Sequence, residues 1–133
     1  MSRLLIAILV FGALLVGCSS SNSDLMGKTW QWTASTTKTP ASQSVVPDPR
    51  NYTIEFKSGG KFDAKADCNQ VSGTWTSSGS SLTIVPGPST MAACGPTSLG
   101  SIYVAGLGLT KSYAIQSSNL VLTTADDATM TFK

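Results

Sequence analysis

The sequence contains no histidine, the side chain that most often serves as a general base or as a metal ligand. It also lacks a phosphate-binding loop, a CxxC pair, a zinc-ligand spacing and a nucleophile-elbow motif. Serines are abundant, but none of them lies in a pattern typical of a nucleophile. These absences argue against an enzyme, and we expect no metal, no cofactor and no catalytic residues.

Positive charge is sparse and scattered. Charged residues make up 12% of the chain, and Lys57, Lys61 and Lys65 form its densest basic group. Binding to nucleic acid needs a basic stripe that displaces counterions, and three lysines spaced along one predicted hairpin do not form one. We therefore expect no nucleic-acid partner.

Carboxylates occur in two groups that could carry chemistry. Asp63 and Asp67 lie on one strand-like stretch, too far apart for a general acid and a general base to cooperate. Asp126 and Asp127 are adjacent, and we interpret them as a hairpin turn rather than as calcium ligands.

One long apolar run is present, at residues 4–16, with Arg3 before it. A helix that crosses a membrane needs about 20 apolar residues, which is more than this run supplies. The core of a secretory signal needs about 7–15, so residues 1–17 are predicted to be a signal peptide.

The end of this run, Leu15-Val16-Gly17-Cys18, resembles the lipobox of bacterial lipoproteins. The resemblance implies that the chain is cut before Cys18 and that Cys18 carries lipid, with residues 18–24 as a polar tether. Two or more acyl chains anchor a protein stably, whereas one binds a bilayer only marginally. Ser19 favours the outer membrane, so we expect a lipid-anchored protein that faces the periplasm, with the membrane itself as a partner.

Cys68 and Cys94 are the remaining cysteines, and an oxidising compartment favours a disulfide between them. In the chain-entropy model, closing this loop constrains the unfolded state by about 3.5 kcal/mol. A reactive thiol is the alternative. Because Cys68 shares the alternation of Phe62 and Ala64, we expect a buried disulfide, with Asn69 and Gly73 as turn residues.

Short alternating segments predict a mainly β (α+β) fold: a small antiparallel meander sheet or partly closed barrel with one helix. The first strand contains Trp30 and Trp32 on its core face. Further strands are predicted at residues 52–57, 61–67, 72–76, 81–85, 112–115, 120–123 and 129–132. The helix is predicted near 99–110, capped by Thr97 or Ser98, with Leu99, Ile102, Tyr103 and Leu107 at helical spacing.

Two segments lack a clear period and are predicted to be irregular. Residues 36–51 are rich in Ser, Thr and Pro and indicate a long surface loop. The sequence Pro86-Gly87-Pro88 is expected to end its strand, with an irregular stretch continuing to Pro96.

Taken in order, residues 25–133 resemble the META domain family of HslJ-like proteins. The matching motifs are Cys68-Asn69, Gly73-Thr74-Trp75 and Thr90-Met91-Ala92-Ala93-Cys94, together with Gly60-Lys61-Phe62 and Leu82-Thr83-Ile84. Asp67 departs from the family, which often has glycine there. The resemblance implies a mainly β fold with one helix, an envelope location and an association with stress or antibiotic tolerance, but no established catalytic site.

Two kinds of function agree with these observations. The first is a non-catalytic envelope lipoprotein that supports stress tolerance by binding or scaffolding an unidentified envelope protein. The alternative is a small protein-binding module, such as a protease inhibitor, that presents residues 36–51 or 86–96 to its partner.

Overall fold

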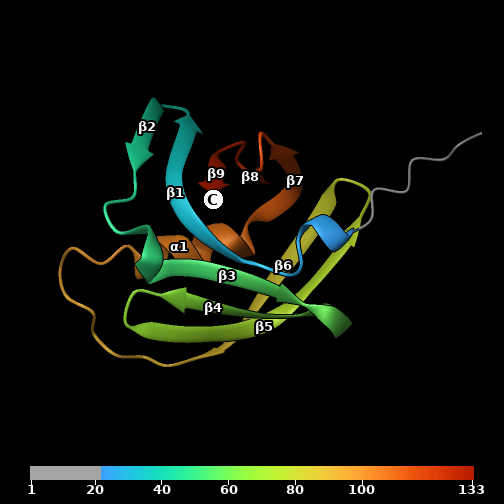
Figure 1. Ribbon diagram of the computed structural model, residues 1–133. Coiled ribbons are helices and arrows are strands. Elements are labelled where there is room, and N and C mark those ends of the chain that lie inside the picture. Colours follow the sequence, from blue (N-terminus) through green and yellow to red (C-terminus); the bar gives the residue numbers. More distant parts are fainter. Residues whose placement is uncertain (1–21) are drawn as a thin grey trace, which may run out of the picture.

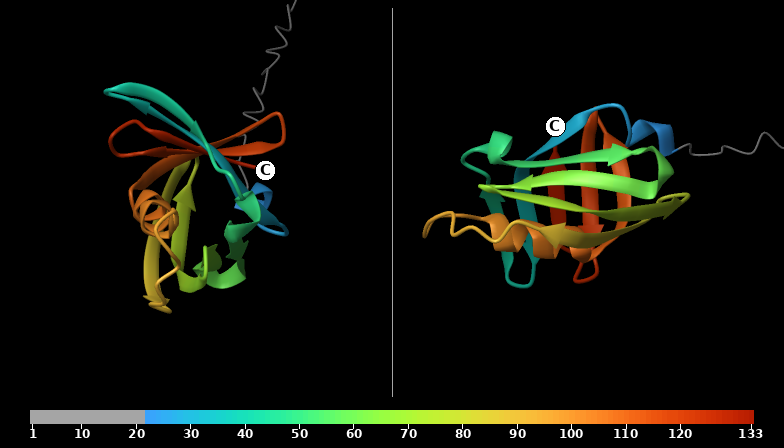
Figure 2. Two further views of the ribbon diagram at one scale, coloured as in Figure 1. Left: turned by 90° about the vertical axis from the view of Figure 1, so that its left-hand side faces the viewer. Right: turned by 90° about the horizontal axis from the view of Figure 1, so that it is seen from below.

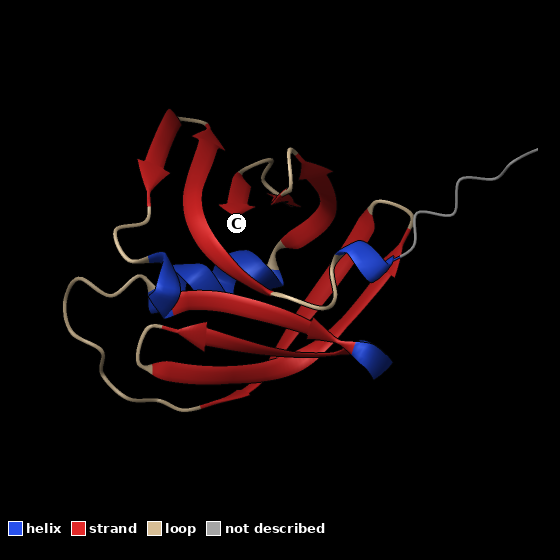
Figure 3. Cartoon of the chain, viewed as in Figure 1, coloured by secondary structure: helices blue, strands red, loops and turns tan. Residues whose placement is uncertain are grey.

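The computed structural model describes residues 22–133, so the predicted signal peptide and Cys18 lie outside the described residues. The chain forms one α-helix and nine strands within this range (Figures 1 and 3). In order, they are β1 (Thr29–Lys38), β2 (Ala41–Val45), β3 (Tyr52–Lys57), β4 (Lys61–Ala66), β5 (Asn69–Ser78), β6 (Ser81–Ser89), α1 (Gly100–Gly108), β7 (Thr110–Gln116), β8 (Asn119–Thr124) and β9 (Thr129–Phe132). Three short 3-10 turns are η1 (Asn22–Asp24), η2 (Pro49–Asn51) and η3 (Ser58–Gly60).

Eight strands close into an antiparallel barrel (Figure 2). The order around the wall is β1-β3-β4-β5-β6-β7-β8-β9, and β9 returns to pair with β1. The remaining strand, β2, pairs only with the second half of β1 and extends from the wall as one arm of a hairpin. The prediction of a mainly β fold with one helix is confirmed.

Alternation along β3 and β4 builds the core. Ile54 and Phe56 of β3 lie opposite Ala64 and Phe62 of β4, and all four are buried. Residues between them point outward, as strand geometry requires when one face packs on the core. Trp30 and Trp32 are also buried, as their spacing predicts.

Gly73 is not a turn residue, contrary to our expectation, but lies within β5. A Cβ atom there would come within 2.2 Å of the Val85 carbonyl oxygen and 2.7 Å of the Phe62 ring. The position needs glycine because neighbouring backbone and ring occupy the space of a side chain.

The predicted loop at residues 36–51 is wrong for most of its length. β1 continues to Lys38, turns, and pairs with β2 over the register Ala34↔Val45 to Lys38↔Ala41. The strand end expected at Pro86 is also wrong, since β6 continues to Ser89. Pro86 lies opposite Gly73, where the register with β5 shifts, and such an irregularity accommodates a residue that has no N–H.

Helix α1 packs against β6 and β4 and inserts Tyr103 and Leu107 into the core. The N-cap residue is Leu99, which makes no side-chain capping hydrogen bond, so the predicted cap at Thr97 or Ser98 is wrong. The Ser98 hydroxyl nevertheless accepts a hydrogen bond from the Gly100 backbone N–H at 3.1 Å, at the first residue of the helix. Ile102, expected on the inward face, is 63% exposed. Among the described residues, no helix has the length and apolar character needed to cross a membrane.

Candidate functional site

An open groove of about 900 Å³ lies between the β1–β2 hairpin and α1. Both elements lie on the left-hand side of Figure 1, together with η2 and the irregular residues 90–99. One wall is Ile102, Ala105, Gly106 and Leu109 of the helical segment; the opposite wall comes from β1, β2 and the residues after β2. The rest of the lining comes from the end of β8, the turn after it and the start of β9, together with Asp67 and residues between 94 and 99.

Trp32 and its neighbours provide a rigid base for the groove. The Trp32 ring is 3% exposed, stacks on Tyr103 with centroids 5.4 Å apart, and meets Tyr52 edge-on at 5.7 Å. Its indole N–H donates to the Ala34 carbonyl oxygen at 3.0 Å and to the Ser35 hydroxyl at 3.1 Å. Aromatic packing and hydrogen bonds therefore fix the orientation of this ring at the base of the groove.

Large apolar residues gather at the groove although water reaches them. Val45, Ile102 and Leu109 line it with exposed fractions of 76%, 63% and 50%. Single exposed apolar residues are common on proteins, whereas several around one concave surface are typical of a binding site. This clustering distinguishes the groove from the rest of the described surface.

The groove also has a distinct charge. Its lining includes Asp48, Asp67 and Asp126 but neither lysine nor arginine. Asp48 accepts a hydrogen bond from the Asn51 amide at 2.9 Å and lies 3.7 Å from the exposed Arg50. Asn51, also in the lining, accepts a hydrogen bond from the Lys65 ammonium at 3.1 Å. Cations therefore adjoin the groove at Asp48 and Asn51, whereas the lining carboxylates of Asp67 and Asp126 take part in none of the ion pairs of the described residues.

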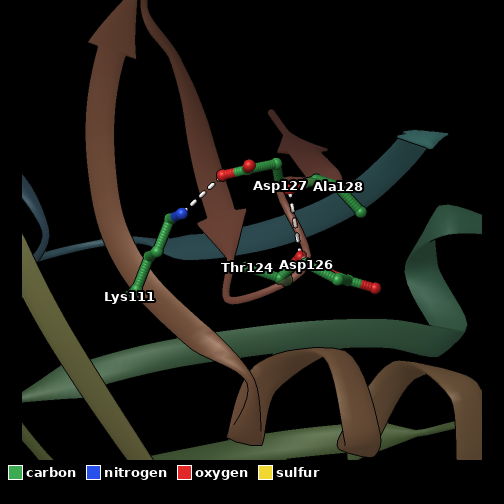
Figure 4. Close-up of polar contacts among 5 residues, drawn as sticks. All are labelled: Lys111, Thr124, Asp126, Asp127 and Ala128. Carbon is green, nitrogen blue, oxygen red and sulfur yellow. Dashed lines mark hydrogen bonds and ion pairs between the residues drawn. The ribbon is translucent and has the colours of Figure 1, made fainter. Parts of the chain in front are cut away.

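The β8–β9 turn places its two carboxylates in opposite directions (Figure 4). Asp127 pairs with Lys111, which lowers the pKa of Asp127 below its usual value. Asp126 accepts a hydrogen bond from the Thr124 hydroxyl, which likewise lowers its pKa. The interpretation of these residues as a hairpin turn is confirmed. Asp126 lines the groove and Asp127 does not.

A disulfide joins Cys68 and Cys94, with a Cα–Cα distance of 5.5 Å. The expectation that it is buried is wrong, because Cys68 is exposed and Cys94 only half-buried. Asp67 adopts φ 60°, which ends the alternation of β4 before it reaches Cys68. Cys94 lines the groove, so the disulfide fastens one end of it.

Asn69 is the first residue of β5 and not a turn residue as we expected, and its side chain holds the segment after β6 in place. Its carboxamide oxygen accepts from the Thr90 hydroxyl at 2.9 Å and from the Ala92 N–H at 2.8 Å. Its amide donates to the Ala92 carbonyl oxygen at 3.0 Å. One side chain therefore satisfies three polar groups of a segment that has no strand partner there, and it fixes the path of the chain from β6 to Cys94.

The groove offers polar groups as well as apolar walls. Its polar lining consists mainly of hydroxyls, one amide and the three carboxylates, and one hydroxyl, that of Thr124, donates to the Asp126 carboxylate. Among residues 22–133, no three His, Cys, Asp or Glu side chains lie close enough together to hold a metal ion. Val45 lies within residues 36–51, one of the two segments expected to meet a partner, and it does line the groove. The sequence does not single out Ile102 or Leu109, because exposure cannot be seen in an apolar residue type alone.

The fold defines the chain as a small closed antiparallel β-barrel with one helix packed into it. Two solved structures share this architecture: a DUF4847 family protein from Bacteroides vulgatus and a protein from Burkholderia xenovorans. The first has a TM-score of 0.64 and 17% identity, covering 84% of this chain and 94% of that chain. The second has a TM-score of 0.68 and 17% identity, covering 99% and 94%. At such identities the likeness concerns the fold alone.

The sequence family is also clear. The META domain model matches residues 23–133, and the chain therefore belongs to the META domain family. The resemblance identified from the cysteine and glycine motifs is confirmed. None of the curated proteins matches the chain.

Proposed function

We propose that this META domain protein is a non-catalytic, lipid-anchored protein of the bacterial envelope that supports stress or antibiotic tolerance by binding another protein. The groove between the β1–β2 hairpin and α1 is the proposed contact surface. The observation that carries the proposal is the gathering of Val45, Ile102 and Leu109 around it. Burying these side chains against a partner gains about 25 cal/mol per Å² of apolar surface removed from water.

The proposed anchor is lipid on Cys18, at the outer membrane and facing the periplasm. The Leu15-Val16-Gly17-Cys18 pattern and the serine-rich residues after it support this location. The turn η1 begins at Asn22, so residues 18–21 separate the proposed anchor from the described fold, and at about 3.3–3.6 Å for each extended residue they span at most roughly 14 Å.

Site-specific photo-crosslinking in bacterial cells that express the full chain tests the binding surface. A photoreactive phenylalanine analogue replaces Ile102 in one variant and Val85 in a matched control, which is 54% exposed and lies outside the groove. We expect a discrete adduct from position 102 and none from position 85. Equal labelling at both positions, or no adduct at 102, contradicts the proposal.

The anchor has its own test. Intact-mass analysis of the mature protein should show acylation of Cys18 and loss of residues 1–17. The Cys18→Ser variant should accumulate as the uncleaved precursor. Normal maturation of that variant would exclude lipid attachment at this residue.

A second candidate function is protease inhibition, favoured by the exposure of every residue of β2. Extended, accessible strands are the form in which a peptide pairs with the edge of another protein. A panel of envelope proteases assayed with the purified full chain decides between the two. Stoichiometric inhibition that is lost on changing β2 residues would favour the inhibitor; hydrolysis of a substrate by the chain itself would contradict both.

A further inference from the structure

We propose that the groove binds an extended, positively charged peptide segment, which adds to the free edge of β2 as a further strand. This inference rests on the proposed function and names the chemistry of its partner. Three features of the described residues carry it: an unprotected strand edge, an apolar wall beside that edge, and carboxylates without lysine or arginine in the lining.

The edge of β2 is open. β2 pairs with β1 along one side, and within residues 22–133 no strand pairs with its other side. Proteins usually protect such edges with lysine, proline or a bulge inside the strand. β2 has the sequence ASQSV, with no charged residue and no proline, and its register with β1 is regular. Its outward backbone groups are therefore available to an incoming strand.

The wall beside β2 suits the side chains of such a strand. A peptide that pairs with an edge gains affinity from main-chain hydrogen bonds and selectivity from pockets that take alternate side chains. Here the groove lies between β2 and α1, where Ile102 and Leu109 remain exposed. Alternate apolar side chains of the bound segment would cover these residues.

The charge of the groove selects a cationic segment. Asp67 and Asp126 lie in the lining and take part in none of the ion pairs of the described residues. The hydroxyl of Thr124 donates to Asp126 and lowers the pKa of this carboxyl group below its usual value. Lysine or arginine near the ends of the segment would meet these groups, and complementary charge raises both the rate and the selectivity of binding.

The same charges disfavour a second copy of this chain as the occupant. Pairing of two β2 edges would bring the acidic margins of two grooves together, and like charges across an interface oppose association. A cationic partner is the choice that the lining supports.

Fluorescence anisotropy with the full chain in non-ionic detergent tests the inference. The first probe is a labelled peptide of seven alternating valine and threonine residues with two lysines at each end. The second has glutamate in place of lysine, and the third is the lysine peptide N-methylated at alternate backbone positions. We expect the lysine peptide to bind about tenfold more tightly than the glutamate peptide, with binding weakened by salt. The N-methylated peptide should not bind, because it cannot complete the strand pairing.

Matched variants test whether the lysine peptide binds in the groove. Ile102→Asn should weaken binding of the lysine peptide by about tenfold, while Val85→Asn leaves it unchanged. Asp126→Asn should weaken it about two- to fivefold. Asp127→Asn is the control, since its carboxylate faces Lys111 on the other side of the turn (Figure 4).

Several outcomes overturn the inference. They are equal affinity for the lysine and glutamate peptides, full binding of the N-methylated peptide, or no effect of Ile102→Asn. A dimer that forms through β2 while the peptides fail to bind assigns the edge to a second copy and overturns it as well. If crosslinking at position 102 succeeds but no cationic peptide binds, this inference fails and the proposed function stands. If both experiments fail, so do both proposals.

Discussion

The β3–β4 and β1–β2 hairpins have equally regular pairing but differ in burial. One lies in the barrel wall, and the other extends from it. β3 and β4 align over six residue pairs, and every second side chain is buried. β1 and β2 align over five pairs, yet all five residues of β2 are exposed. One hairpin is part of the barrel wall, and the other extends from it to form one side of the groove.

This difference separates two sources of strand formation. Burial of apolar side chains stabilises β3 and β4 and leaves an alternating pattern in their sequence. β2 is held as a strand by its backbone hydrogen bonds to β1. Such bonds require no particular residue types. We therefore expect changes in the wall to affect stability strongly, and changes in β2 to affect binding instead.

Phe62→Ala should have the largest effect. The ring is 1% exposed and faces Phe56 across the hairpin, so its removal leaves a cavity in the wall. We expect the free energy of unfolding to fall by about 3–5 kcal/mol. Urea unfolding followed by tryptophan fluorescence measures it. Ile115→Ala, at a residue 39% exposed, is the control and should change little. If both variants lost a similar free energy of unfolding, burial in the barrel wall would not be what stabilises β3 and β4.

Removing the disulfide should come next in size. The double variant Cys68→Ser and Cys94→Ser frees the end of the groove, and we expect a loss of up to about 3.5 kcal/mol from the unconstrained unfolded chain. Hydrogen exchange should also rise at residues 90–99. Unchanged exchange there would indicate that the contacts of Asn69 hold the segment without the covalent bond.

Tyr103→Phe tests the buried hydroxyl of Tyr103, the residue that packs against Trp32 at the base of the groove. The Tyr103 hydroxyl is buried without a hydrogen-bond partner among the described residues, so its removal should raise stability by up to about 1 kcal/mol. Burial raises the pKa of Tyr103, so the folded chain keeps a proton that the unfolded chain releases near pH 10. The stability of the native protein should therefore decline as the pH rises above about 10, and less steeply in the variant. Destabilisation by Tyr103→Phe at pH 7 would reveal a partner for the hydroxyl.

Gln43→Ala in β2 should have the smallest effect. The side chain is exposed, and we expect a change within about 0.5 kcal/mol by urea unfolding. A loss comparable to that of Phe62→Ala would show that β2 contributes to the core.

The same contrast explains what could be predicted from the sequence. The strands around Ile54, Phe62 and Leu122 alternate because they bury one face, and their positions were predicted well. β2 was missed since exposed serines and a glutamine resemble a loop. Helical spacing groups Ile102 with the buried Tyr103 and Leu107, but α1 is apolar around most of its surface, so the spacing does not single out the buried side. The burial of the disulfide was misjudged because one positive φ, at Asp67, reverses the alternation.

The pairing of β1 with β9 has a consequence for how the chain acquires its structure. Gln31 exchanges two backbone hydrogen bonds with Lys133, at 2.8 and 2.9 Å, which joins the first strand of the barrel to the residue that follows the last. Contacts between such distant parts of a chain form late, because a long loop must close before they contribute. A chain delivered from its N-terminus would therefore expose the edges of β1 and β8 until β9 arrived. During that interval the barrel would remain an open sheet, and a chaperone or another strand could bind it.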